Sequence, residues 1–329
     1  MSVVIPVVDE AGRIARCLRA VLDQEWPADR LEILIVDGAP GDGTGEVARE
    51  VLGDAGHRLA AVIANPGGGR SENLNVGLRR AQGEILCRVD ARSAIPPHYV
   101  RSCVDALEDA ATAVIGGMQT AVAATTRAHE CGICRGLTNS FAMGGARYRR
   151  STTAVDADTV YLGAFRREDL LAVGGWDEAL GANEDFDLNT RMRTSTGRVR
   201  FDPALRVAYQ PRDTLRAVAA QYWSFGRWKG RYLQHRNERP KPRQMVGLAV
   251  APATVLFLAA VTAGWPLRRS ILGATAVVAL AAIDHVGAAP DDQRAPLATR
   301  GWAAATAITV TSSWSAGLWY EILSGHRRA

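Results

Sequence analysis

The sequence lacks the patterns that mark several common protein classes. Its five cysteines, an odd number in 329 residues, are scattered and do not form the framework of a secreted disulfide-rich domain. It contains neither the G-x-G-x-x-G fingerprint of dinucleotide-binding folds nor a Walker motif, which argues against a nicotinamide dehydrogenase. No basic stretch followed by a long apolar run precedes the first apolar segment. We therefore expect no secretory signal and a first domain that stays in the cytoplasm.

One pair of cysteines has the spacing of a metal ligand pair. The segment His129-Glu-Cys131-Gly-Ile-Cys134 carries a single Cys-x-x-Cys and no second pair elsewhere in the sequence. A zinc or redox site needs more ligands than this segment offers. We interpret these residues as small side chains on a buried helix.

The chain is basic, with a net charge of +5 and a pI of about 9.1. Arginine and lysine concentrate in residues 227–243, directly before a long apolar stretch. A basic segment in that position is typical of a surface that faces anionic lipid headgroups. We predict a membrane partner and no nucleic acid.

Apolar, β-branched runs alternate with amphipathic segments from Ser2 to about Phe201. Strands are expected at residues 2–8, 31–36, 59–64 and 84–89, and helices at residues 14–22, 44–52 and 71–81. This alternation predicts an α/β fold with a largely parallel sheet covered by helices on both faces. Ligands of such sheets bind beyond the carboxyl ends of the strands.

The composition changes after residue 243. Residues 245–264, 271–289 and 302–323 are each about long enough to cross a bilayer, and tryptophans lie near their ends. We therefore divide the chain into a domain at 1–225, a basic interfacial linker at 226–244 and a membrane region of about three apolar helices at 245–329. Arginines in the turns conflict with the positive-inside tendency, so the number of complete crossings stays open.

Two predicted strands end in carboxylates. Asp37 begins the turn Val36-Asp-Gly-Ala-Pro-Gly-Asp-Gly-Thr44, where it can accept hydrogen bonds from a base or ribose. Asp90 follows the strand at 84–89, where it can bind a ribose hydroxyl or a divalent cation that bridges diphosphate oxygens. The loop Asn65-Pro-Gly-Gly-Gly-Arg-Ser71 can place its amides and Arg70 over a nucleotide.

An acidic pair, Glu184-Asp185, stands at the start of a predicted helix. The exposed amides and the dipole of a helix start favour negative charge, so a carboxylate can be held there as a catalytic base. An ordinary salt-bridged helix start is the alternative, with Glu184 and Asp187 facing Arg191.

The order of Asp37, Asp90 and Glu184-Asp185 resembles the family 2 glycosyltransferases of the GT-A fold. The phrases Arg88-Val-Asp-Ala-Arg92 and Asn183-Glu-Asp-Phe-Asp-Leu-Asn189 are similar to those of the succinoglycan-type exopolysaccharide glucosyltransferases. Two further phrases, Val160-Tyr-Leu-Gly-Ala-Phe-Arg-Arg167 and Gly174-Gly-Trp-Asp-Glu178, share this similarity.

The resemblance implies a role for each matching residue. The residues implied to line the nucleotide pocket are Pro6, Asp9, Glu10 and Asp37, and Arg70 is added from its loop. Asp90 would hold the ribose and the metal-diphosphate, with Mg²⁺ or Mn²⁺ as the cation. Asp185 would be the general base that deprotonates the acceptor hydroxyl, and Glu184 would brace the acceptor pocket.

The sequence departs from the family pattern at two places. Arg92 stands where the family usually has Asp or His, and arginine has no acceptor with which to ligate a metal. We expect Arg92 either to contact a phosphate or to point to solvent. Ser224-Phe-Gly-Arg-Trp228 matches the processive Gln-x-x-Arg-Trp motif only in part, which favours single addition over polymer extension.

The expected function is an inverting glycosyltransferase at the inner membrane, with its catalytic domain facing the cytoplasm. It would move a hexose, expected to be glucose from UDP-glucose, onto a lipid-linked glycan acceptor in polysaccharide biosynthesis. Direct transfer onto polyprenyl phosphate and a catalytically silent module that binds nucleotide sugars are the alternatives.

Overall fold

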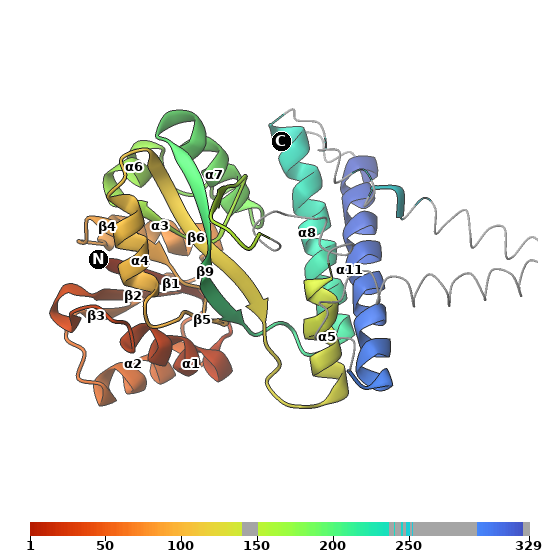
Figure 1. Ribbon diagram of the computed structural model, residues 1–329, viewed down its shortest axis with the longest axis horizontal. Coiled ribbons are helices and arrows are strands. Elements are labelled where there is room, and N and C mark those ends of the chain that lie inside the picture. The colour runs from red at the N-terminus through yellow and green to blue at the C-terminus, as the bar shows by residue number, and fades with distance from the viewer. Residues whose placement is uncertain are drawn as a thin grey trace, which may run out of the picture. The chain divides into compact units, whose positions relative to one another are not determined.

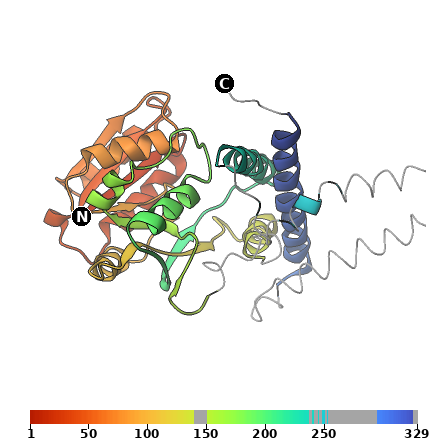
Figure 2. The same cartoon turned by 90° about the horizontal axis from the view of Figure 1, so that it is seen from above.

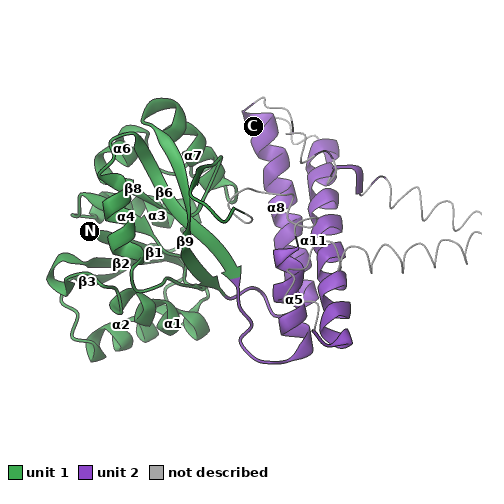
Figure 3. Ribbon diagram, viewed as in Figure 1, with its two compact units in different colours: residues 1–120, 147–209 green, residues 121–146, 210–329 purple. Residues whose placement is uncertain are grey.

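The computed structural model describes residues 1–139, 151–236, 240, 245, 248–250, 252 and 295–324. The chain forms two compact units (Figure 3). The first contains residues 1–120 and 147–209, and the second contains residues 121–146 and 210–329. The boundary predicted after residue 225 falls inside a continuous helix of the second unit.

The first unit begins with four parallel strands that match the prediction within one or two residues. The strands are β1 (Ser2–Val7), β2 (Glu32–Asp37), β3 (Ala60–Ala64) and β4 (Ile85–Arg88), in the spatial order β3-β2-β1-β4 (Figure 1). The helices between them are α1 (Ala11–Leu22), α2 (Thr44–Asp54) and α3 (Arg70–Arg80), with the short 3-10 helix η1 (Ala28–Arg30) before β2. Each loop at a carboxyl end therefore lies at one edge of the sheet.

The rest of the sheet corrects the prediction of a largely parallel sheet, because it is mixed. The remaining strands are β5 (Ser93–Ala94), β6 (Thr112–Ala121), β7 (Val155–Asp156), β8 (Tyr161–Arg166) and β9 (Arg198–Tyr209). The order continues from β4 through β8, β6 and β9 to β5, with β8 antiparallel to both β4 and β6. An apolar run can form a buried strand that is parallel or antiparallel to its neighbour. The orientation of β8 could therefore not be deduced from its composition.

Helices cover both faces of the sheet in the first unit (Figure 2). Along β1, Val3 and Ile5 are buried in one core cluster and Val4 in the other, because successive side chains point to opposite faces. The first cluster includes α1, α2 and α4 (Tyr99–Leu107), and the second includes α3, α6 (Arg167–Ala172) and α7 (Glu184–Ser195). Because both faces of the sheet are buried against helices, the strands are held in place and the loops at the carboxyl edge begin from fixed positions.

The second unit contains the helices α5 (Ala128–Thr138), α8 (Leu215–His235) and α11 (Leu297–Ser324). α8 and α11 approach closely at two glycines, since a Cβ on Gly226 would lie 2.1 Å from the Trp314 carbonyl oxygen and one on Gly317 would lie 2.2 Å from that of Trp223. Glu321 of α11 is fully buried and pairs with Arg227 and Arg231 of α8. Neither glycine can be replaced without separating the helices.

The predicted membrane segments are only partly covered by the described residues. Residues 302–323 form part of α11, so this segment is helical as expected. Residues 245–264 and 271–289 lie almost entirely outside the described residues. Within the described part of the chain, no helix combines the length and the apolar character that a membrane crossing needs.

Candidate active site

The loops after β1 and β2 are joined by the side chains of Asp42, in the second loop, and Thr44, the first residue of α2. Asp42 accepts hydrogen bonds from the backbone amides of Asp9 at 2.6 Å and Thr44 at 2.7 Å. The Thr44 hydroxyl in turn accepts from the amide of Glu10 at 3.0 Å. Asp9 has a φ of 54°, a left-handed conformation that these contacts help to hold. Neither Asp42 nor Thr44 was predicted as a site residue, although Asp-x-Thr at a helix start is a typical turn signal.

Asp37 lies at the end of β2 and is 3% exposed. Its Oδ1 accepts from the Ala39 amide at 3.0 Å, and burial raises the pKa of its carboxyl group. The next loop packs directly against it, because a Cβ on Gly38 would lie 2.1 Å from the Gly68 carbonyl oxygen. The glycines here serve loop packing as well as the tight turn predicted from the sequence.

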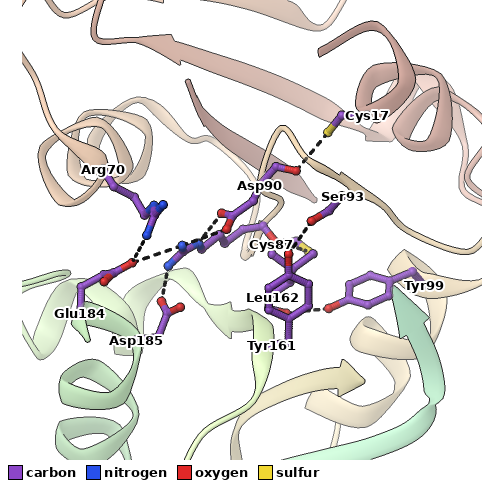
Figure 4. A network of polar contacts seen from close by, with 11 residues as sticks. Cys17, Arg70, Cys87, Asp90, Ser93, Tyr99, Tyr161, Leu162, Glu184 and Asp185 are labelled. Atoms are coloured by element: carbon purple, nitrogen blue, oxygen red, sulfur yellow. Dashed lines mark hydrogen bonds and ion pairs between the residues drawn. The ribbon is translucent and has the colours of Figure 1, made fainter. Parts of the chain in front are cut away.

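One buried arginine joins the carboxylates of two distant segments. Arg88, at the end of β4, has a side chain only 3% exposed. It donates from Nε to Asp90 Oδ1 at 2.8 Å and from Nη2 to Asp90 Oδ2 at 3.2 Å. It also donates from Nη2 to Glu184 at 3.3 Å and from Nη1 to Asp185 Oδ1. Asp90, Glu184 and Asp185 therefore surround a single guanidinium group (Figure 4).

The backbone around Asp90 is held from the opposite side. Cys17 of α1 donates from its thiol to the Asp90 carbonyl oxygen at 3.5 Å, and the hydroxyls of Ser93 and Tyr161 are 2.7 Å apart (Figure 4). Burial raises the pKa of the Cys17 thiol above its usual range, so this group stays neutral. The Asp90 carboxyl has a lowered pKa: burial alone would raise it, but Arg88 and Arg70 outweigh that effect.

The loop before α7 sets where the acidic pair lies. Gly174 and Gly175 have φ values of 83° and 69°, a conformation that other residues rarely adopt. Trp176 is 1% exposed. Its backbone amide donates to Asn75 Oδ1 at 2.9 Å, and its carbonyl oxygen accepts from Asn75 Nδ2 at 2.8 Å. Arg191 of α7 donates to the Gly175 carbonyl at 2.7 Å. The Gly-Gly-Trp segment thus joins α7 to α3 and to the core.

The alternative interpretation of this helix start, an ordinary salt bridge to Arg191, is correct for one of its carboxylates. Asp187 pairs with Arg191 at 2.8 Å, which is an ordinary salt bridge one turn apart. Glu184 instead faces Arg88 and Arg70, each at 3.3 Å, and its side chain is 4% exposed. The acidic pair is therefore directed to the network around Arg88.

Asp185 differs from its neighbour in exposure and in acidity. Its side chain is 36% exposed, so one side of the carboxylate is open to another molecule. Loss of solvation raises the pKa of Asp185 to about 7; Arg88 opposes this rise, and Glu184 adds to it. A carboxylate with a pKa near neutrality is suited to accept a proton from a hydroxyl.

We expect the catalytic rate to follow the ionisation of Asp185. The base acts only when deprotonated, so kcat/KM should fall about tenfold per pH unit below about pH 6 and level off above about pH 8. Initial rates from pH 5 to 9 at fixed ionic strength measure this limb. A rate that stays constant from pH 9 down to pH 5, as an aspartate with its ordinary pKa near 4 would give, would contradict the raised pKa.

Arg92 does not point to solvent, so that alternative from the sequence is wrong. Its side chain is 8% exposed, and its Nε donates to Glu10 Oε1 at 2.7 Å. Its two terminal nitrogens are buried without a hydrogen-bond partner among the described residues. Arg92 is held at the sheet edge because Glu10, in the loop after β1, supplies an opposite charge in the protein interior.

The structure thus arranges the predicted site residues in three sets at one sheet edge. Asp90, Glu184, Asp185 and Arg70 gather around Arg88; Glu10 pairs with Arg92; and Pro6, Asp9 and Asp37 belong to the ends of β1 and β2. Among the described residues, no group of three or more His, Cys, Asp or Glu side chains could hold a metal ion. His129, Cys131 and Cys134 lie on α5 as expected, with Cys134 buried.

Residues 2–171 match Glycosyl transferase family 2. The chain belongs to this family. The match includes Asp37 and Asp90 and ends before the acidic pair of α7. The protein is therefore a glycosyltransferase.

Two relatives and one solved structure extend this result. The succinoglycan biosynthesis protein ExoA of Rhizobium meliloti is 30% identical over 338 residues, covering 99% of this chain and 96% of that protein. An undecaprenyl-phosphate 4-deoxy-4-formamido-L-arabinose transferase of Edwardsiella ictaluri is 28% identical over 109 residues, covering 33% of this chain and 34% of that protein. A mannosyltransferase from Pyrobaculum calidifontis, in complex with GDP-mannose and Mn²⁺, has a TM-score of 0.67 and 19% identity and covers 98% of this chain and 87% of its own. This likeness identifies the GT-A fold.

Proposed function

We propose that this glycosyltransferase inverts the anomeric centre of a hexose as it transfers the sugar from a nucleotide donor to a lipid-linked glycan. The observation that carries the proposal is Asp185, a partly exposed carboxylate with a raised pKa, held beside Asp90 through a shared arginine. Asp185 takes the proton of the acceptor hydroxyl, and the acceptor oxygen forms a bond to the anomeric carbon. The bond from that carbon to the donor diphosphate breaks on the opposite face.

The donor is assigned to the edge formed by the ends of β1, β2 and β4. Asp37 and the loop of Asp9 and Glu10 supply polar groups there, and Pro6 lies in the last part of β1. Arg70 is 43% exposed and stands at the start of α3, where its positive charge and the helix amides suit a diphosphate. UDP-glucose is the donor we propose, on the likeness to the succinoglycan protein.

A divalent cation fits this edge only as a partner shared with the donor. Asp90 is an ionised carboxylate with a side chain 21% exposed, and one carboxylate together with substrate phosphates is a usual set of ligands for Mg²⁺. Mg²⁺ or Mn²⁺ held there would neutralise negative charge on the leaving diphosphate. Arg92, two residues further on, supplies positive charge but no ligand.

We expect the cation and the nucleotide to bind cooperatively. The described residues contain no group of three or more His, Cys, Asp or Glu side chains that could hold a metal ion, so Asp90 needs the diphosphate as a second source of ligands. Mn²⁺ should therefore bind the donor-free enzyme weakly and at least about tenfold more tightly when a nucleoside diphosphate is present; linkage requires the reciprocal effect. Calorimetric titration of Mn²⁺ with and without the diphosphate measures the two Mn²⁺ affinities, and titration of the diphosphate with and without Mn²⁺ measures the reciprocal effect. Tight Mn²⁺ binding without nucleotide, or no change on adding it, would contradict a site shared with the donor.

Membrane attachment is the second part of the proposal. It is supported by the basic residues at 227–243, the apolar composition after residue 245, and a relative whose name specifies undecaprenyl phosphate. We propose attachment at the inner membrane with the catalytic domain facing the cytoplasm. Recovery of the full chain in the membrane fraction, with release by detergent but not by high salt, tests insertion against surface binding.

A donor screen tests the proposed function. Full-length protein in detergent would be incubated with UDP-glucose, other UDP-hexoses and GDP-mannose, and release of the nucleoside diphosphate would be followed with and without acceptor. Release that requires a lipid-linked glycan supports the proposal, whereas release with polyprenyl phosphate alone assigns the acceptor to that lipid. Donor binding without release under any condition would leave a silent binding module.

A further inference from the structure

Arg88 connects Asp90, the carboxylate proposed to hold the donor, with Asp185, the proposed base. Its Nε and Nη2 hold both oxygens of Asp90, and its Nη1 holds Oδ1 of Asp185. The side chain is buried and rises from the end of β4, a strand paired on both sides within the sheet. Its position is therefore set by the rigid part of the first unit and not by a loop.

The hydrogen bonds leave one atom of the base available. Oδ1 of Asp185 is bound to Arg88, while Oδ2 has no partner among the described residues and the side chain is 36% exposed. Glu184, the adjacent acid, is 4% exposed and is bound by both Arg88 and Arg70. Oε2 of Glu184 also has no hydrogen-bond partner among the described residues, but the side chain of Glu184 is almost completely buried. Oδ2 of Asp185 is therefore the unpaired oxygen of the acidic pair that lies on a partly exposed side chain.

We propose that Arg88 is the positioning residue of the base: it fixes Oδ1 of Asp185 so that Oδ2 receives the proton of the acceptor hydroxyl. By holding Asp90 with the same guanidinium, it also sets the distance between the donor-binding carboxylate and the base. This inference rests on the proposed function. A displacement of about 1 Å between reacting groups costs a rate factor of about 10².

The geometry requires arginine in particular. A guanidinium group is planar and presents its donors in a fixed fork, so different nitrogens can reach Asp90, Glu184 and Asp185 at once. A lysine ammonium would neutralise charge from a single atom and could not hold the carboxylates in one orientation. Arg88→Lys therefore keeps the positive charge but loses the fixed orientation of the donors, so it tests positioning apart from charge.

A purely structural role for Arg88 makes a different prediction. If the arginine only neutralises three buried carboxylates, its loss lowers stability, and any loss of rate is independent of Asp185. If it acts by orienting Asp185, its loss has no further effect on kcat once the base is gone. A double-mutant cycle distinguishes these outcomes.

The experiment compares full-length Arg88→Met, Arg88→Lys, Asp185→Asn and the two double variants in the nucleoside diphosphate release assay. We expect Arg88→Met to lower kcat about 10²-fold and Arg88→Lys about tenfold, with a smaller change in the KM for the donor. In the Asp185→Asn background, each replacement should lower kcat less than about threefold further. Arg193→Gln is the matched control. Arg193 lies on α7, the helix that carries Asp185, and forms an exposed ion pair with Asp158 at 3.5 Å.

The outcomes separate this inference from the proposed function. Multiplicative losses in the double variants would overturn the positioning role while leaving Asp185 as the base. Near-normal turnover of Asp185→Asn would overturn both. Should Arg88→Met fail to fold, as judged by its near-UV circular dichroism, the Arg88→Lys cycle carries the test, and wild-type kcat in Arg88→Lys would overturn the inference.

Discussion

Replacing Asp185 with asparagine is expected to lower kcat by a factor of about 10² to 10⁴, the usual loss when a positioned base is removed. Asparagine has nearly the same shape and still accepts a hydrogen bond from Arg88 through its amide oxygen. It cannot take a proton from the acceptor hydroxyl. Donor affinity, measured by calorimetry, should therefore change little while the rate of diphosphate release collapses.

The matched control for this variant is Asp158→Asn. Asp158 is a carboxylate of similar exposure, 39% against 36%, and it pairs with an arginine of α7. The same chemical change there should leave kcat within about twofold of wild type, as for surface substitutions in general. Near-normal turnover of Asp185→Asn, or an equal loss in both variants, would remove Asp185 from its role as the base.

Replacing Glu10 with glutamine is expected to lower the free energy of unfolding by about 3 to 5 kcal/mol, because glutamine can still accept a hydrogen bond but leaves the buried charge of Arg92 without an opposite charge. Arg92→Met should cost less than half as much, since Glu10 keeps a second partner in Arg13 at 3.7 Å. The double variant Glu10→Gln with Arg92→Met should be more stable than Glu10→Gln alone. Urea unfolding followed by tryptophan fluorescence measures all three.

Glu46→Gln provides the control for this series. Glu46 pairs with Arg49 at 3.8 Å on the surface of α2, with side chains 66% and 59% exposed. Exposed pairs contribute little, so this variant should unfold at the wild-type urea midpoint. If Glu10→Gln also unfolded there, the pair with Arg92 would be as unimportant to stability as a surface contact.

The elements around the site were predictable from local patterns. The four parallel strands and the three helices between them start and end within a few residues of the expected positions, because apolar periodicity is a property of consecutive residues. The same holds for the acidic pair at the start of α7 and for Asp37 and Asp90 at strand ends. The membrane segments were read from apolar length, and they stay a prediction.

The direction of the later strands was decided only by tertiary structure. β8 has the apolar content of a buried strand, and it would suit either orientation beside β4. Its antiparallel pairing depends on the path of the chain between residues 88 and 161. Local composition carries no record of that path, which is why a largely parallel sheet was expected and a mixed one is found.

By itself the sequence determined which residues of this protein carry charge at the sheet edge and where the helix of the base begins. Only the tertiary structure decided their partners: Arg88 meets Asp185 across 97 positions of the chain, Arg70 meets Glu184 across 114, and Arg92 meets Glu10 across 82. The physical reason is that burial in a core shared by distant segments makes an unpaired charge costly, so each charge takes the partner that the fold brings to it.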